Sequence, residues 1–157
     1  MKLVFIGYVT GPFGIKGEVK IVSETNHKNE IFKIGNTLYI EDVPYKIVSI
    51  KKNNKHEIIG FENIDTIEKT NLILRKPVYV NLKEVNVNSY LIGQIPDMDV
   101  YEKEVFLGKV GEVLYNKKCT YIKVSRYIIP LIDNFVEKID TDNNVIRVKN
   151  IGELDED

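Results

Sequence analysis

The feature that most constrains the fold is a series of short stretches in which apolar and polar residues alternate. In residues 17–23, for example, Val19 and Ile21 alternate with Lys20. Successive side chains of a β-strand point to opposite faces, so this spacing predicts a strand with one buried and one wet face. The whole chain lacks alanine, the best helix former, and is rich in Ile, Val, Tyr and Thr, which favours β structure further.

The first half of the chain reads as five short strands separated by turn residues, and a sixth follows a helical segment. They lie at residues 2–9, 17–23, 36–42, 45–52, 56–61 and 76–82. Short strands joined by tight connections favour a small closed barrel, because closure leaves no exposed sheet edge. In the third stretch the alternation points Leu38 and Ile40 to one face and Tyr39 to the other.

Between the fifth and sixth stretches, Ile64, Ile67, Asn71 and Leu74 lie at roughly helical spacing, with Ile73 nearby. This predicts one short helix over residues 66–75. Asp65 is the expected N-cap, with Glu68 three residues later as in a capping box.

The second half predicts another small all-β domain. Strands are expected at residues 105–116, 119–124, 126–132, 134–140 and 145–150. Acidic residues in 96–104 and 139–144 are best explained as solvated charge on turns. The domain plan is therefore a barrel domain over 1–81, a polar linker over 82–90, a second domain over 91–152 and a frayed acidic tail over 153–157.

The net charge of −1 hides a difference between the halves. Residues 1–80 carry 12 Lys or Arg and 9 Asp or Glu residues, whereas residues 81–157 carry 10 and 14. A basic half and an acidic half could meet two different partners, such as a nucleic acid and a basic protein. Chance together with the acidic tail explains the difference equally well.

Residues 7–21, GYVTGPFGIKGEVKI, place four glycines within eleven positions. A phosphate-binding loop needs Gly-Lys followed by Ser or Thr at the start of a helix, but here Lys16 is followed by a glycine and then a strand. The stretch instead predicts a glycine-shaped loop between two strands, with Phe13 and Ile15 at its tip. These side chains either fold back over the barrel or contact a partner.

No constellation for catalysis, metal binding or a cofactor stands out. Cys119 is the only cysteine, and His27 and His56 lie apart without a motif around them. The best patches for nucleic acid are residues 51–56 and the pair Lys16 and Lys20, but neither contains interleaved aromatic residues. We expect no catalytic residue, cofactor or metal.

No apolar run in the sequence is long enough for a transmembrane helix, and the start of the chain does not have the composition of a signal peptide. We therefore expect a cytoplasmic protein that does not interact with a membrane.

The order of these segments resembles the RimM family of bacterial small-subunit ribosome maturation factors. Residues 7–21 are similar to its glycine-rich N-terminal signature, and residues 61–80, FENIDTIEKTNLILRKPVYV, resemble its next segment, with Lys76 where Gly is usual. Residues 91–148 resemble its C-terminal PRC-barrel domain, and IIPLIDNFVEKID at 128–140 is the most specific part of the match.

The resemblance implies an N-terminal six-stranded antiparallel barrel, similar to barrels in translation factors, and a C-terminal PRC barrel. It also implies a monomeric, non-enzymatic assembly factor that binds the immature small (30S) ribosomal subunit and its rRNA. Such a factor would contact ribosomal protein S-nineteen largely through the PRC barrel and would promote head maturation and 16S rRNA processing. The alternative is a generic RNA-binding barrel protein without that protein partner.

The partner-binding residues suggested by these motifs are Gly11, Pro12, Phe13, Gly14, Ile15, Gly17, Tyr90, Leu91, Ile92, Pro130 and Asp133. One departure from the family pattern lies beside them. Where the family often has a pair of tyrosines before the second domain, this chain has Asn86 and Val87, and Tyr90 occupies a position that is usually Asp.

Overall fold

The computed structural model describes residues 2–85, 87, 89–115 and 119–154. The chain forms two compact units, residues 1–93 and residues 94–157. The first unit contains strands β1 (Leu3–Phe13), β2 (Glu18–Val22), β3 (Thr37–Ile40), β4 (Val43–Lys52), β5 (Glu57–Phe61) and β6 (Pro77–Asn81). The second contains β7 (Asp99–Glu102), β8 (Val105–Tyr115), β9 (Thr120–Val124), β10 (Tyr127–Pro130), β11 (Val136–Asp140) and β12 (Val145–Val148).

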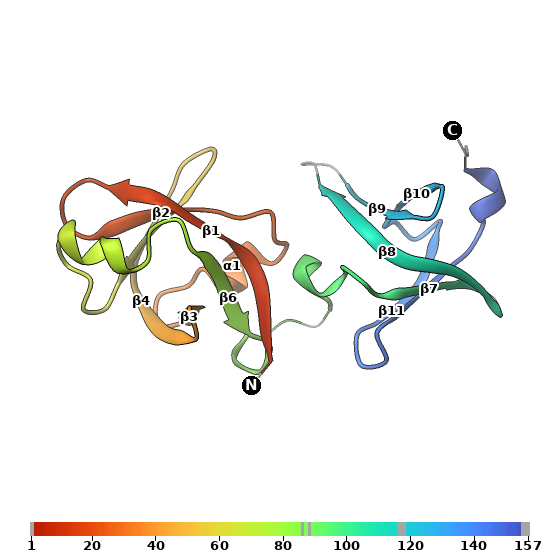
Figure 1. Cartoon of the computed structure of the whole chain (residues 1–157), viewed down its shortest axis with the longest axis horizontal. Helices are drawn as coiled ribbons and strands as arrows, with labels where there is room; N and C mark the ends of the chain where they lie inside the picture. Colours follow the sequence, from red (N-terminus) through yellow and green to blue (C-terminus); the bar gives the residue numbers. More distant parts are fainter. Residues whose placement is uncertain (1, 86, 88, 116–118, 155–157) are drawn as a thin grey trace. The chain divides into compact units, whose positions relative to one another are not determined.

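The first unit is a closed barrel with strand order β1-β2-β5-β4-β3-β6 (Figure 1). Every neighbouring pair is antiparallel, and β1 pairs with both β2 and β6 to close the barrel. The all-β class and the closed barrel expected from the short strands are therefore confirmed, as is the six-stranded antiparallel form that the family resemblance implies.

The barrel interior is filled by branched aliphatic side chains. Val9, Val19, Ile21, Leu38, Ile47 and Ile59 are all 0% exposed. A one-turn helix, α1 (Lys28–Ile31), and the next residue add Ile31 and Phe32 to this core. The sequence did not predict α1, because four residues are too short to show a helical period.

Two predicted details of the first unit are wrong. The helix expected over 66–75 is a shorter 3₁₀ helix, η1 (Glu68–Leu72). Asp65 does not cap it: the Thr66 hydroxyl accepts a hydrogen bond from the Lys69 amide at 3.3 Å, while Asp65 pairs with the Lys69 ammonium at 2.8 Å. The hydrogen bond from the Lys69 ammonium and its positive charge hold the pKa of the Asp65 carboxyl below its usual value.

Tyr39 faces outward, as the alternation predicts, and is nevertheless buried. Leu38, Tyr39 and Ile40 are all buried, although their side chains alternate along β3. The outward-facing Tyr39 is 7% exposed and donates a hydrogen bond to Glu84 Oε1 at 2.8 Å. The alternation was correct, but the chain after β6 returns over the outer face of β3.

The second unit is a curled six-stranded sheet with order β10-β9-β8-β7-β12-β11, which is the form that the predicted PRC barrel takes here. All neighbours are antiparallel except β12 and β7, which are parallel. Its core includes Val100, Val110, Ile122, Val124, Ile129 and Ile146, none more than 1% exposed.

The sequence analysis missed β7, because the acidic residues around Val100 suggested a solvated turn. Asp99 and Glu102 lie at the two ends of this strand, and Val100 between them is fully buried. The expected frayed tail, residues 153–157, follows a buried residue. Ile151, in the 3₁₀ helix η4 (Ile151–Glu153), is 3% exposed, and its amide donates to the Glu102 carboxylate at 3.2 Å. Residues 155–157 of that tail lie outside the described residues.

Two further one-turn 3₁₀ helices, η2 (Leu82–Glu84) and η3 (Ile92–Gln94), lie between β6 and β7. In the part of the chain that the structure describes, no helix has the length and apolar character needed to span a membrane.

The glycines of the β1–β2 turn differ in how strongly the fold requires them. Gly14 and Gly17 both have positive φ, at 70° and 88°. A Cβ on Gly14 would meet nothing within 4 Å, whereas one on Gly17 would overlap the carbonyl oxygen of Ile64. Gly17 therefore allows the turn to lie against the loop before η1.

We predict that Gly14→Ala lowers the free energy of unfolding by about 1 kcal/mol, the cost of a positive φ for a residue with a Cβ. Gly17→Ala adds a backbone clash and should lower it by about 3 kcal/mol or more. Urea denaturation of the two variants and the parent measures this difference. Equal destabilisation by both substitutions would contradict the assigned crowding at Gly17.

Candidate functional site

The first group of predicted site residues, Gly11 to Gly17, lies on the β1–β2 hairpin. The strand predicted to end at residue 9 continues to Phe13, because Pro12 pairs with Val19 and Phe13 pairs with Glu18. Only residues 14–17 form the turn. Phe13 was expected at the tip of the loop, but it is a strand residue.

The two apolar side chains of this hairpin have different environments. Ile15 projects from the turn and is 76% exposed. Phe13 is 39% exposed, and the Lys51 ammonium lies 5.9 Å from the centroid of its ring. The same ammonium lies 3.2 Å from Glu18 Oε1. Neither apolar side chain folds back into the barrel core.

The second group, Tyr90 to Ile92, is fastened to the first barrel by one side chain. The Asn26 amide donates from Nδ2 to the Tyr90 carbonyl at 2.9 Å and accepts at Oδ1 from the Ile92 amide, also at 2.9 Å. Between these two contacts, Leu91 is 0% exposed and belongs to the core of the first unit. We call residues 89–93 the docked segment.

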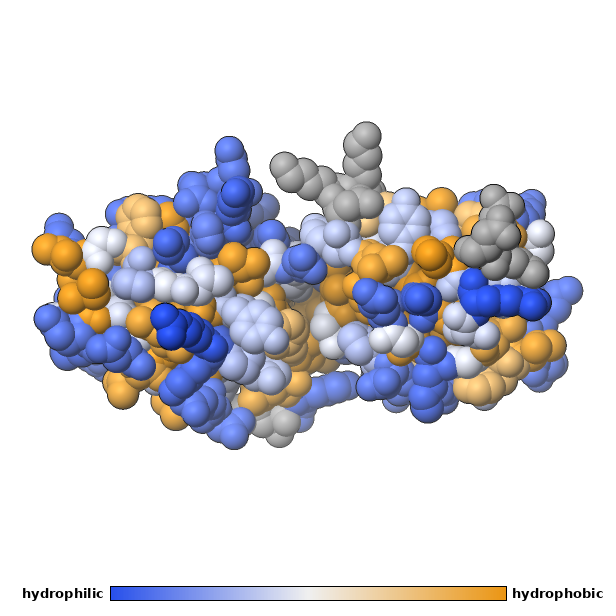
Figure 2. Space-filling model, turned by 45° about the horizontal axis from the view of Figure 1, so that its top comes forward, coloured by the Kyte–Doolittle hydropathy of each residue, from blue (hydrophilic) through white to orange (hydrophobic). Residues whose placement is uncertain are grey.

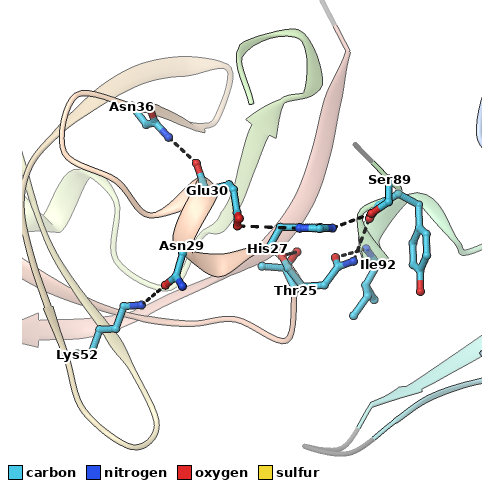
Figure 3. A network of polar contacts seen from close by, with 10 residues as sticks. Thr25, His27, Asn29, Glu30, Asn36, Lys52, Ser89 and Ile92 are labelled. Atoms are coloured by element: carbon cyan, nitrogen blue, oxygen red, sulfur yellow. Dashed lines mark hydrogen bonds and ion pairs between the residues drawn. The ribbon is translucent and has the colours of Figure 1, made fainter. Parts of the chain in front are cut away.

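Further contacts hold the docked segment at both ends. His27 Nε2 and Ser89 Oγ share a hydrogen bond of 2.8 Å, and Glu30 lies on the other side of the imidazole with its carboxylate 3.9 Å from Nδ1 (Figure 3). At the far end, a Cβ on Gly93 would overlap the Phe5 carbonyl oxygen, so the backbone there packs directly on β1.

A local turn after β2 places Asn26 for this role. The Ser23 hydroxyl donates to the Ile6 carbonyl at 2.5 Å and accepts from the Thr25 amide at 3.2 Å. This hydroxyl ties the end of β2 to β1 and turns the chain toward α1. The sequence analysis missed Asn26, because its partners lie 64 and 66 residues away and leave no local signal.

The chain between β6 and the docked segment also lies on the barrel. The Leu82 amide donates to the Lys2 carbonyl at 2.9 Å. The hydrogen bond from Tyr39 to Glu84, together with burial and the nearby negative charge, raises the pKa of the Tyr39 phenol. Of the departures noted near this region, Val87 is half-buried, and Asn86 lies outside the described residues.

These two groups do not form one site. The β1–β2 hairpin lies at the carboxyl end of β1, whereas the docked segment packs at Phe5 near its amino end. The eight residues from Phe5 to Phe13 span about 25 Å of strand. The structure therefore assigns the hairpin and the docked segment to opposite ends of the first barrel.

The remaining predicted residues, Pro130 and Asp133, lie at the end of β10 and just after it. Pro130 pairs with Tyr121 in β9, which pairs in turn with Leu114 in β8. Their neighbours Ile122 and Ile129 are fully buried, so this row faces outward.

Other apolar residues extend this outer surface of the second unit. Leu114 is 37% exposed, and Ile128 and Ile132 are each 45% exposed. Glu112 and Asp133 are exposed acidic residues on the same strands and loop, and the exposed Lys123 pairs with both Glu112 and Ile128. We call Leu114, Tyr121, Ile128, Pro130 and Ile132, with these two acids, the β8–β10 face.

The described residues contain no group of three or more His, Cys, Asp or Glu side chains placed to hold a metal ion. Cys119 is half-buried at the start of β9, and its Sγ lies 3.4 Å from the Thr120 carbonyl oxygen. The arrangement offers surfaces for binding, and we derive no chemical step from it.

Comparison with known families identifies the first unit. The model of the RimM N-terminal domain matches residues 4–85, which extend from β1 through the residues that follow η2. The chain belongs to the RimM family. The resemblance inferred from the glycine-rich stretch is thereby confirmed.

Relatives named ribosome maturation factor RimM match over most of their length. Those of Bacillus mycoides and Bacillus cereus are each 27% identical over 158 residues, covering 91% of this chain and 92% of the relative. The relative of Bacillus thuringiensis is 28% identical with the same coverage.

Two solved RimM structures are similar. That of the Pseudomonas aeruginosa 16S ribosomal RNA processing protein RimM is 19% identical, with a TM-score of 0.48, and covers 98% of this chain and 100% of its own. That of the N-terminal domain of RimM from Thermus thermophilus is 16% identical, with a TM-score of 0.48, and covers 55% of this chain and 98% of its own.

We predict that Asn26→Ala releases the docked segment from the first barrel of this RimM protein. Loss of two buried or half-buried hydrogen bonds should lower the free energy of unfolding by about 2 kcal/mol. It should also speed proteolytic cleavage within residues 82–93, measured by limited proteolysis and mass spectrometry.

Asn36→Ala is a matched control. The Asn36 side chain also makes two hydrogen bonds to the backbone, both donated to the carbonyls of Glu30 and Ile31, and none to the docked segment. Its removal should affect stability without changing cleavage in 82–93. If the two variants are cleaved there at the same rate, Asn26 does not hold the segment in place.

Proposed function

We propose that this protein is a non-enzymatic assembly factor that acts in the cytoplasm on the immature small (30S) ribosomal subunit. It promotes maturation of the subunit head and processing of 16S rRNA. The observation that carries the proposal is family membership: the RimM N-terminal domain model matches residues 4–85, and relatives named ribosome maturation factor match over 91% of the chain.

The protein partner in this proposal is ribosomal protein S-nineteen. This protein acts as a monomer and binds its partner through the second unit. Residues 94–157 carry 9 Lys or Arg and 13 Asp or Glu residues, a net charge of −4. An acidic surface attracts a basic partner and speeds its association. This supports assigning the basic ribosomal protein to this unit.

Within that unit, the β8–β10 face is the proposed contact. Exposed Leu114, Ile128 and Ile132 supply apolar area beside Tyr121 and Pro130, and Glu112 and Asp133 supply negative charge. Apolar and aromatic residues at the centre with charges at the rim are the usual anatomy of a specific protein interface.

The predicted residues of the first unit take different parts in the proposal. Phe13, Gly14 and Ile15 are exposed and can contact the subunit directly. Gly17 and Leu91 are buried, so they shape the hairpin and hold the docked segment. Tyr90 and Ile92, both half-buried, lie beside Leu91 with their backbones bound to Asn26.

We predict that the immobilised full chain captures purified S-nineteen at moderate salt. Ile128→Lys should weaken this binding about tenfold or more, because it places a charge in the apolar part of the contact. Asp133→Lys should mainly slow association and reduce its salt dependence. Surface plasmon resonance separates these two effects.

Val105→Lys is the control, since Val105 is 60% exposed and lies at the start of β8, outside the β8–β10 face. It should bind like the parent. Failure of the full chain to capture S-nineteen at any salt concentration would refute the partner. Binding of RNA alone, without S-nineteen, would favour the generic RNA-binding alternative.

A further inference from the structure

The outer wall of the first barrel carries two lysines in one row, one on each side of β5. Val19 in β2 and Ile59 in β5 are cross-strand partners buried inside the barrel. Because side chains alternate along a strand, the next pair, Lys20 and Ile58, faces outward. Lys51 in β4 pairs with the same Ile58 from the other side.

Ile58 shows how these lysines lie. It faces outward but is only 3% exposed, and Lys20 and Lys51 are its cross-strand neighbours on either side. The Lys51 side chain is 60% exposed, and Lys20 is half-buried. On the other side of Lys20, Gly11 is its partner in β1, and a Cβ there would meet only Lys20 Cε, at 3.8 Å. The surface beside this lysine is therefore open.

Aromatic rings flank the lysine row on both sides. Phe13, one row nearer the hairpin turn, is 39% exposed and lies under the Lys51 ammonium. On the opposite side, Tyr8 is 52% exposed, and its partner Val22 is two residues from Lys20 in β2. Tyr8 and Phe13 are about 15 Å apart along β1.

The aromatic surface continues onto β6. The rings of Phe5 and Tyr8 meet edge to face at a centroid distance of 5.0 Å, and Phe5 meets Tyr79 in the same way at 5.9 Å. Figure 2 shows hydrophobic and hydrophilic residues lying next to one another over the visible face of the first unit. We call Tyr8, Phe13, Lys20 and Lys51, with Phe5 and Tyr79, the lysine–aromatic wall.

The charge around this wall is positive. Residues 14–22 and 46–61, which include β2, β5 and most of β4, carry six lysines and two glutamates. One glutamate, Glu18, neutralises part of the Lys51 charge through their ion pair, and the other, Glu57, is buried. The excess of lysines suits a polyanion.

We propose that the lysine–aromatic wall binds single-stranded RNA. Exposed rings stack on unpaired bases, and lysines between them contact phosphates, which is how proteins bind single strands without reading sequence. An acidic protein could also contact the lysines and the rings, but rings and lysines alternating along the wall match the alternating bases and phosphates of a single strand. This inference deepens the proposed function and rests on it in one respect, that the RNA is rRNA of the immature subunit.

The test measures binding of the full chain to a fluorescein-labelled uridine oligomer of about 12 nucleotides by fluorescence anisotropy at several salt concentrations. Tyr8→Ala and Phe13→Ala should each weaken binding about 5- to 150-fold, the usual effect of removing one stacking ring. Lys20→Gln should lower the slope of log affinity against log salt by about 0.7.

Matched controls separate stacking from folding. Tyr8→Phe keeps the ring and should bind within a few-fold of the parent. Phe106→Ala removes a ring that is 52% exposed in the second unit, and Lys33→Gln removes an exposed lysine outside the wall, so both should bind like the parent. Thermal unfolding followed by circular dichroism checks that each variant is folded.

Unchanged affinity in the folded Tyr8→Ala and Phe13→Ala variants would overturn the inference, as would equal affinity for a duplex RNA of the same length. If polyglutamate displaces the RNA at equal charge concentration and its own binding falls in the same variants, the wall binds acidic protein instead. Loss of RNA binding with S-nineteen capture intact would refute this inference alone. Retained RNA binding without S-nineteen capture would count against the proposed function alone.

Discussion

The first unit depends on one strand, β1, that is hydrogen-bonded to a neighbouring strand on each side. Over its eleven residues, β1 pairs with β2 through its carboxyl half and with β6 through its amino half. The register shifts between Val9 and Gly11 on one side and between Phe5 and Gly7 on the other. Such bulges increase bending and twist, which a small barrel needs in order to close. Every surface of the first unit discussed above is positioned by this strand.

The same strand explains why the two ends of the first unit differ in character. At its carboxyl end, β1 extends into a hairpin that carries the exposed Ile15. At its amino end, the backbone is covered by the chain that follows β6, through Leu82 and Gly93. One end is therefore available to a partner, whereas the other is occupied by the protein's own chain.

Much of the first barrel could be predicted from sequence, because several strands carry their own alternating pattern. Val19 and Ile21 are buried as the pattern requires. Tyr39 and Val100 are buried by parts of the chain that local patterns do not reveal. The chain after β6 covers Tyr39, and the rest of the second unit covers Val100, so the residues next to them in sequence do not indicate their burial. The family signature, in contrast, could be found because it is a run of adjacent residues.

The candidate surfaces were harder to predict for the same reason. Residues 51–56 contain lysines without aromatic residues, and Phe13 comes close to Lys51 only because β1, β2, β5 and β4 are neighbours in the barrel. Asn26 recognises two backbone groups of a segment more than sixty residues later. Pairings of this kind belong to the topology and not to any stretch of the sequence.

The closure of the barrel also sets an order of events during synthesis. The partner of the first strand is the last strand of the unit, β6, so the barrel cannot close before residue 81 has left the ribosome. Until then the amino half of β1 lacks its strand partner, and contacts of such large sequence separation form slowly. A factor proposed to help assemble ribosomes would thus spend the synthesis of its first eighty residues as an open sheet, closing only as the linker to its second unit emerges.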